Sequence, residues 1–202
     1  MSFITKGLPD FVRISGMLVP INTDFRKYMQ FETAFFDLNL TNEDKLSILV
    51  ENALGDQHIP VTRDVIEVLM LFYRCGEPIV KKKGDSCTQN CDLPYCFEYD
   101  AGRIYSAFLH DYNINLANAK LHWWEFRALF NSLSDETEFV KVLHYRCVEI
   151  TGDMTKKEQD FYKKMKIKYA LPRKIAGQDK KNIEKEMIER SIRAREEEKR
   201  NG

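Results

Sequence analysis

The stretch Leu121-His-Trp-Trp-Glu-Phe-Arg-Ala-Leu-Phe-Asn-Ser-Leu133 decides how this chain folds. It holds both tryptophans of the sequence. At helical spacing, its aromatic and aliphatic side chains cover nearly the whole surface of the helix. A helix that is apolar on almost all sides is buried against several neighbours, so the pattern predicts the central helix of a bundle. The residues that this pattern assigns to the core are Trp123, Trp124, Phe126 and Phe130.

Turn and cap residues divide the rest of the chain into short elements. Residues 11–21 favour a β-hairpin, because two β-rich runs flank Ser15-Gly16 and glycine takes the positive φ of a tight turn. Helices are expected where a Ser, Thr or Asp side chain can accept hydrogen bonds from the free N–H groups of a first turn. In chain order, these expected N-caps are Thr23 or Asp24, Thr41, Thr62, Asp100, Ser134 and Thr155.

The end of the chain differs from the rest. Thr155 and Glu158 have the spacing of a capping box, which starts a helix that ends at Leu171-Pro172. Residues 179–200 then favour a mostly charged helix with a thin apolar stripe. The stripe consists of Ile183, Met187, Ile188 and Ile192. Because so narrow a stripe must dock on another surface to be stable, we predict that these four residues bind a partner.

The expected fold is mainly α: a helical bundle with a small N-terminal β-hairpin and a charged C-terminal helical arm. The distribution of charge supports this division. Residues 1–150 carry 15 Lys and Arg against 21 Asp and Glu, whereas residues 151–202 carry 16 against 10. We therefore predict an acidic helical body, residues 1–151, and a basic helical arm, residues 152–202.

The sequence contains no membrane signal. No stretch approaches the run of about 18 apolar residues that a membrane helix needs. The N-terminus also lacks the basic region and long apolar run of a signal peptide. The expected location of the protein is thus the cytosol, where its five cysteines do not form a disulfide framework.

Residues 76–99 lack periodicity and are expected to form an exposed loop. Four of the five cysteines lie in or beside it: Cys75, Cys87, Cys91 and Cys96. Four thiolates can hold a zinc ion, but zinc-binding sequences usually show two tight cysteine pairs, and this one does not. We predict no metal here, although the zinc interpretation stays open.

No catalytic motif is present. His122 and Glu125 stand one helical turn apart, as in metal-binding bundles, but such bundles need the motif twice and the sequence has no second copy. A histidine at the rim of the aromatic core is the expected role. The sequence also lacks a phosphate-binding glycine loop, a His-Glu-x-x-His motif and a Gly-x-Ser-x-Gly elbow. We therefore expect neither a cofactor nor enzymatic activity.

The basic arm admits two interpretations. Its Lys and Arg residues could contact nucleic acid, but they alternate with glutamates, such as Glu184, Glu186 and Glu189. A surface that binds the phosphates of a nucleic acid would instead carry mainly positive charges. Mixed charge with a thin apolar stripe is more typical of a partner-binding helix.

Several motifs, in order along the chain, resemble the bacteriophage gene-product-fifteen family of long-tailed phages and prophages of Gram-positive bacteria. They are Pro20-Ile-Asn-Thr-Asp-Phe-Arg26, Ile104-Tyr-Ser-Ala-Phe108 with Tyr112, Leu121-His-Trp-Trp-Glu-Phe-Arg-Ala-Leu129, Tyr145-Arg146 and Tyr169-Ala-Leu-Pro172. The Trp-Trp block is the most distinctive. The cysteine-containing loop departs from the family, with which no metal site is associated.

The resemblance implies a role in phage assembly. Members of this family are typically encoded between the major tail protein and the tape-measure protein, a position usually held by tail-assembly chaperones. It therefore implies a non-enzymatic factor that binds the tape-measure protein in the host cytoplasm. Two alternatives stay open: a structural virion component of the tail or head–tail connection, and a nucleic-acid-binding regulator. The arm's partner is expected to be the tape-measure protein or another copy of this chain.

Overall fold

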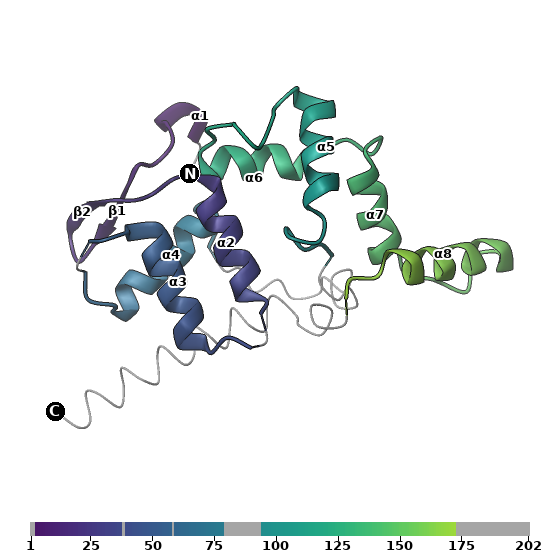
Figure 1. The fold of residues 1–202 in the computed structure, drawn as a ribbon, viewed down its shortest axis with the longest axis horizontal. Coiled ribbons are helices and arrows are strands. Elements are labelled where there is room, and N and C mark those ends of the chain that lie inside the picture. Colours follow the sequence, from purple (N-terminus) through teal and green to yellow (C-terminus); the bar gives the residue numbers. More distant parts are fainter. Residues whose placement is uncertain (1–2, 38, 58, 79–93, 173–202) are drawn as a thin grey trace. The chain divides into compact units, whose positions relative to one another are not determined.

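The computed structural model describes residues 3–37, 39–57, 59–78 and 94–172. These residues form eight helices and one two-stranded antiparallel sheet, so the prediction of a mainly α fold with an N-terminal hairpin is confirmed (Figure 1). None of the described helices combines the length and the apolar character that crossing a membrane requires. The elements are α1 (Phe3–Lys6), β1 (Phe11–Ile14), β2 (Met17–Pro20), α2 (Phe25–Phe35), α3 (Asn42–Leu54), α4 (Arg63–Tyr73), α5 (Ala101–Tyr112), α6 (Trp123–Asn131), α7 (Glu138–Cys147) and α8 (Lys156–Tyr169).

Four of the expected N-caps are confirmed. The side chain of Asp24 accepts a hydrogen bond from the backbone N–H of Arg26 and starts α2. Thr62 starts α4 in the same way. Thr41 and Thr155 each form a complete capping box, with the acidic residue three positions later, and start α3 and α8. These caps satisfy N–H groups that have no partner inside their helices.

One expected N-cap is wrong, and another is confirmed in position only. Helix α7 begins after Thr137, whose side chain accepts a hydrogen bond from Val140, and not after Ser134. Ser134 instead donates through its backbone N–H and hydroxyl to Asp111. Asp100 stands at the start of α5, but its side chain makes no cap hydrogen bond. Its carboxylate is used elsewhere, by a buried arginine.

The described residues divide into two compact units. The first unit holds α1 to α4, the hairpin and Lys120–Ala128; the second holds residues 94–119 and 129–172. Helix α6 therefore begins in the first unit and ends in the second. The predicted division into a body, residues 1–151, and an arm, residues 152–202, stays a prediction, although α8 belongs to the second unit together with α5 and α7.

The core of the first unit is built around the start of α6. Trp123 is fully buried and stacks on the rings of Tyr28 and Tyr73, with centroid distances of 5.3 and 5.6 Å. Phe126 is also fully buried and stacks on Phe25 at 4.9 Å. Rings in such stacked arrangements attract each other beyond the contribution of the area that they bury. The core that the sequence assigns to this helix thus consists of aromatic side chains from α2, α4 and α6.

The indole groups of both tryptophans also donate hydrogen bonds to carbonyl groups at the end of α4. The last carbonyl groups of a helix have no partner within it. The indole N–H of Trp123 donates to the carbonyl of Tyr73 at 2.7 Å, and that of Trp124 donates to the carbonyl of Phe72 at 2.9 Å. Two adjacent tryptophans therefore bind two adjacent carbonyls. This pairing explains physically why the chain uses two indoles here and not two phenyl rings.

The second unit has its own aromatic cluster. Phe130, near the end of α6, contacts the rings of Tyr95, Phe97 and Phe139 at centroid distances of 5.0, 5.5 and 5.3 Å. All four residues that the sequence assigns to the core are buried, three of them in the first unit and Phe130 in the second. Ala128, which lies between the two groups, is exposed, so α6 is not buried all round.

A buried ion pair holds the second unit together. Arg146 of α7 binds both carboxylate oxygens of Asp100, at 2.7 and 2.9 Å, and both side chains are almost completely buried. The same guanidinium donates to the carbonyls of Pro94 and Tyr169. The Asp100 carboxylate also accepts a hydrogen bond from the backbone N–H of Cys96. One arginine therefore joins the start of α5, the segment before it and the end of α8.

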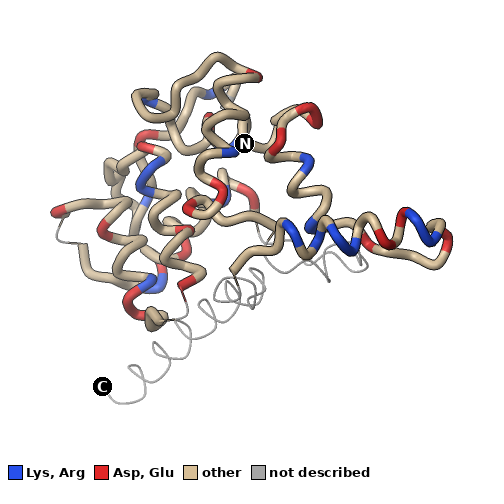
Figure 2. Tube along the Cα trace, turned by 45° about the vertical axis from the view of Figure 1, so that its right-hand side comes forward, with Lys and Arg blue, Asp and Glu red and all other residues tan. Residues whose placement is uncertain are grey.

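Helix α8 packs on α7 through one side. The ring of Tyr145 stacks on that of Tyr169 at 5.7 Å, and Lys166 donates to the carbonyl of Arg146 at 2.8 Å. No residue of α8 is fully buried, and basic residues are frequent along it (Figure 2). The motifs Tyr145-Arg146 and Tyr169-Ala-Leu-Pro172, which are far apart in the sequence, meet in this contact.

Candidate protein-binding surface

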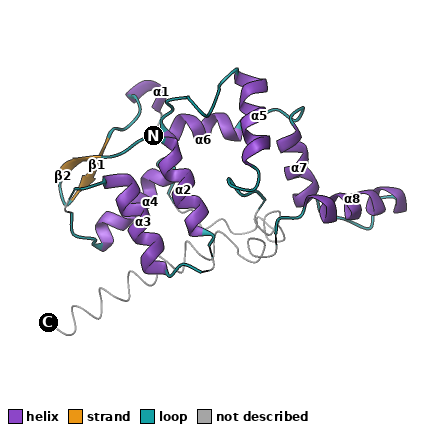
Figure 3. Cartoon of the chain, in the orientation of Figure 1, coloured by secondary structure: helices purple, strands orange, loops and turns teal. Residues whose placement is uncertain are grey.

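The hairpin (Figure 3) carries three of the exposed large apolar side chains of the first unit. Its turn is formed by Ser15 and Gly16, both with positive φ, which is the geometry that matches the twist of a two-residue hairpin. The strands pair in the register Val12 with Val19 and Ile14 with Met17. The predicted turn at Ser15-Gly16 is therefore confirmed, and it fixes which side chains face inward.

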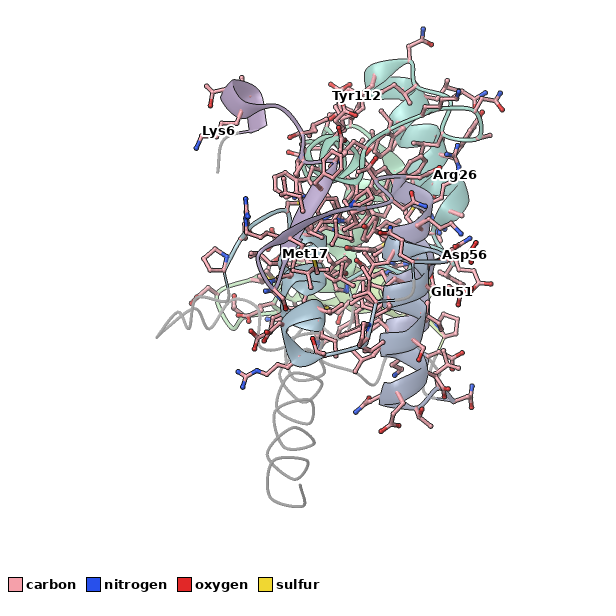
Figure 4. The ribbon with its side chains drawn as sticks, turned by 90° about the vertical axis from the view of Figure 1, so that its left-hand side faces the viewer. Lys6, Met17, Arg26, Glu51, Asp56 and Tyr112 are labelled. Carbon is pink, nitrogen blue, oxygen red and sulfur yellow. The ribbon has the colours of Figure 1, made fainter. Side chains whose placement is uncertain are left out.

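The two faces of the hairpin are both largely apolar. Val12, Ile14 and Val19 point inward and are buried. Phe11, Met17 and Leu18 are 54%, 66% and 64% exposed. Figure 4 looks onto this part of the molecule and labels Met17 next to the turn. Phe11 and Leu18 belong to the outer face, whereas Met17 pairs with Ile14 and stands at the end of the inner face, beside the turn. An exposed group of large apolar side chains is typical of protein-binding surfaces.

A charged side chain on the outer face of the hairpin strengthens its turn. Arg13 stands opposite Leu18, and its guanidinium donates to the carbonyl of Gly16 at 2.9 Å. The hairpin is also continued past its last pair, because the backbone N–H of Ile21 donates to the carbonyl of Asp10. A two-stranded hairpin is marginally stable alone, and this one is anchored by its buried face. It can therefore present its outer apolar residues without losing its structure.

His122 is a structural residue, as the sequence predicts. Its Nδ1 accepts a hydrogen bond from the backbone N–H of Trp124, which leaves the proton on Nε2, and Nε2 lies 3.2 Å from the carbonyl of Pro9. The backbone N–H of His122 donates to the carboxylate of Glu125. The two residues thus start α6 in the manner of a capping box. Their spacing of three residues is explained by the helix start.

Stability should depend on the protonation of His122. Burial lowers the pKa of its imidazole, so the unfolded chain takes up the proton at a higher pH than the folded chain. We expect full stability above about pH 6.5 and a loss of stability as the pH falls below that value. The melting temperature of the protein should fall between about pH 7.5 and pH 5.5 by more than that of a His122→Gln variant.

Because the titration ends at about pH 5.5, the protonation of carboxylates does not contribute to the comparison. Hydrogen bonds lower the pKa values of Asp44, Asp111 and Glu158, so the stability that these groups contribute is lost at more acidic pH. Equal changes in melting temperature for the protein and the variant would show that His122 does not titrate in this range.

The structure describes only some of the other residues that the sequence suggests as sites. Ile183, Met187, Ile188 and Ile192 lie outside the described residues, as do Cys87 and Cys91. Cys75 is partly buried, and burial raises the pKa of its thiol to about 11. No group of three or more His, Cys, Asp or Glu suited to a metal ion occurs among residues 3–78 and 94–172, as far as these are described. The zinc interpretation of the loop therefore stays untested.

The sequence missed two features that the structure places on the surface. The outer face of the hairpin was visible in principle, because the alternation of strand residues puts Phe11 on the side opposite Val12. The exposed side of α8 depends on how the helix packs, which the sequence does not show. Phe161 and Ile167 are exposed, whereas Tyr162 and Tyr169 lie on the packed side of the helix.

The chain matches a known protein family. The family described as Bacteriophage Gp15 protein matches residues 4–171. No curated protein and no solved structure matches the chain. The matched residues span the hairpin, all the described helices from α2 to α8 and the buried Asp100–Arg146 pair, and they end before the stripe of the C-terminal arm. The match covers far more than half of the sequence, and the chain therefore belongs to the bacteriophage Gp15 family.

Proposed function

We propose that this protein is a phage tail-assembly chaperone that binds the tape-measure protein in the host cytoplasm while the tail is being built. It acts by binding and not by catalysis. Membership of the bacteriophage Gp15 family is the observation that carries the proposal. Genes of this family typically stand between those of the major tail protein and the tape-measure protein, where tail-assembly chaperones are usually encoded.

The exposed face of the hairpin supports this function. A tape-measure protein is long, largely helical and apolar, and it needs a cover until the tail tube encloses it. Phe11 and Leu18 offer exposed apolar surface on the outer face of the hairpin, and the exposed Met17 adds to it beside the turn. Burying such area contributes about 25 cal/mol per Å², so three side chains supply several kcal/mol before the cost of association is subtracted. A contact of this strength is reversible, and a chaperone must release its client.

The client-binding residues predicted from the sequence belong to the arm: Ile183, Met187, Ile188 and Ile192. They remain part of the proposal as a second contact with the client. Two weak contacts joined by one chain bind more tightly than either alone, provided that the client spans both. The hairpin and the arm can therefore be tested separately for their share of the affinity.

Co-purification with the client tests the function. The tape-measure protein from the same phage genome is expressed together with the tagged chain, and the captured amount is measured. We expect the full chain to retain the client, and the variant Phe11→Thr/Leu18→Thr to retain at least tenfold less, because each substitution keeps strand propensity while removing apolar surface. Val61→Thr/Leu109→Gln is the matched control, since both side chains are exposed and lie outside the hairpin.

A chain that ends at Pro172 measures the contribution of the arm in the same assay. We expect it to lose part of the captured client and to keep the rest through the hairpin. If the full chain does not retain the tape-measure protein, the proposed function is wrong. Stoichiometric presence of the protein in purified virions would favour a structural component of the particle instead.

A further inference from the structure

One exposed side of α8 carries a regular stripe in which two lysines flank an apolar residue. Lys157, Phe161 and Lys164 follow one another at i, i+4 and i+7, so they lie on one face of the helix. All three are exposed, and Phe161 keeps 46% of its surface uncovered while one edge of its ring contacts Tyr145. An apolar residue thus stands between two lysines, which are about two helical turns, or about 10 Å, apart.

The helix itself does not explain this stripe. Basic residues stabilise the last turn of a helix, which accounts for Lys166 and Lys168. In the first turn a positive charge is unfavourable, yet Lys157 stands there. Within the described part of the chain, neither Lys157 nor Lys164 forms an ion pair or a side-chain hydrogen bond. The two charges are therefore available to a partner.

Helix α3 carries the complementary stripe with the same spacing. Asp44, Ile48 and Glu51 stand at i, i+4 and i+7; the two acidic residues are exposed and Ile48 is half-buried. The hydrogen bonds from Thr41 lower the pKa of Asp44, so its carboxylate is charged at neutral pH. Figure 4 labels Glu51 and Asp56 on the same side of the first unit, which extends the acidic surface past the end of α3.

We propose that α8 of one copy of this protein docks on α3 of a second copy. In an antiparallel arrangement, Lys157 meets Glu51, Lys164 meets Asp44, and Phe161 packs on Ile48. Two charged contacts then flank one apolar contact, and their equal spacing along the two helices fixes the register. The proposal is independent of the proposed function, because its contacts use neither the hairpin nor residues 173–202.

The observations favour a second copy over a nucleic acid. A surface that binds phosphates gathers many cations and few carboxylates. On α8, Glu158 and Asp160 lie among the lysines and are exposed. A protein surface with alternating acidic and apolar residues fits the lysine–phenylalanine–lysine stripe better, and α3 is such a surface on the same chain.

Charge-reversal substitutions test the proposal in solution. Sedimentation velocity of the full chain should show reversible self-association at low ionic strength that weakens in high salt, because exposed ion pairs are screened. Lys157→Glu/Lys164→Glu and, separately, Glu43→Lys/Glu51→Lys should each reduce the association at least tenfold. Glu43 is used because Asp44 also closes the capping box of α3, and Glu43 stands next to it on the same turn. An equimolar mixture of the two variants should associate again.

The control variant is Lys6→Glu/Lys120→Glu. It changes the net charge by the same amount as Lys157→Glu/Lys164→Glu, at exposed lysines outside both helices. It should associate like the unchanged chain. A monomer at all concentrations in low salt would overturn the proposal, and so would a mixture of the two variants that does not associate. Salt-dependent binding of a DNA duplex that is lost in Lys157→Glu/Lys164→Glu, without self-association, would identify nucleic acid as the occupant instead. Because client capture is measured separately, failure here leaves the proposed function standing.

Discussion

Trp123→Ala is expected to lower the free energy of unfolding by about 3–5 kcal/mol, the range measured when large buried aromatic residues are truncated. Trp123 is fully buried and has stacked rings on two sides, from Tyr28 and Tyr73. Removing it leaves a large cavity and also removes the indole that donates to the carbonyl of Tyr73. Chemical denaturation followed by circular dichroism measures the loss.

Two further variants separate the contributions. Trp123→Phe keeps most of the ring volume but leaves the buried carbonyl of Tyr73 without its indole donor, which should cost about 1–3 kcal/mol. Tyr99→Ala is the control, because the side chain of Tyr99 is 47% exposed and its removal leaves no closed cavity. Near-normal stability of Trp123→Ala would contradict the assignment of this residue to the core.

Local patterns predicted most helix starts, because a cap depends on residues within three or four positions of one another. Thr41 with Asp44 and Thr155 with Glu158 are complete capping boxes. The prediction at Ser134 is wrong because it also rests only on nearby residues. Ser134 and Thr137 both fit the pattern, and what decides between them is Asp111, which engages Ser134 from 23 residues away.

Surface function was harder to predict, because the sequence does not state which apolar residues remain uncovered. The hairpin has apolar residues on both faces, and only the packing of one face shows that Phe11 and Leu18 are exposed. The stripe of Lys157, Phe161 and Lys164 on α8 was not predicted for a related reason. Its lysines were counted as part of a basic arm, whereas the packing on α7 separates Lys166, which binds a carbonyl, from Lys157 and Lys164.

The Asp100–Arg146 pair could not be predicted from spacing, since its partners are 46 residues apart. Breaking it should have the second large effect on stability. Asp100→Asn leaves the buried guanidinium of Arg146 without its carboxylate partner. Arg146→Met removes the two strongest hydrogen bonds to the Asp100 carboxylate and the donors to the carbonyls of Pro94 and Tyr169. Each substitution is expected to destabilise the protein by about 3–5 kcal/mol, as the removal of one partner of a buried ion pair usually does.

The double variant Asp100→Asn/Arg146→Met distinguishes a coupled pair from two separate losses. It removes both charges, so no buried charge is left uncompensated, and its effect should be smaller than the sum of the single effects by more than about 1 kcal/mol. Arg103→Met is the comparison, because Arg103 binds the same carboxylate and also Glu138 from a side chain that remains 28% exposed, so its removal should cost less than that of Arg146. Additive effects of Asp100→Asn and Arg146→Met would show that the pair is not the link between α5, α7 and the end of α8. A coupled result would instead explain why the motifs Tyr145-Arg146 and Tyr169-Ala-Leu-Pro172 occur together: the arginine of one binds the main chain of the other.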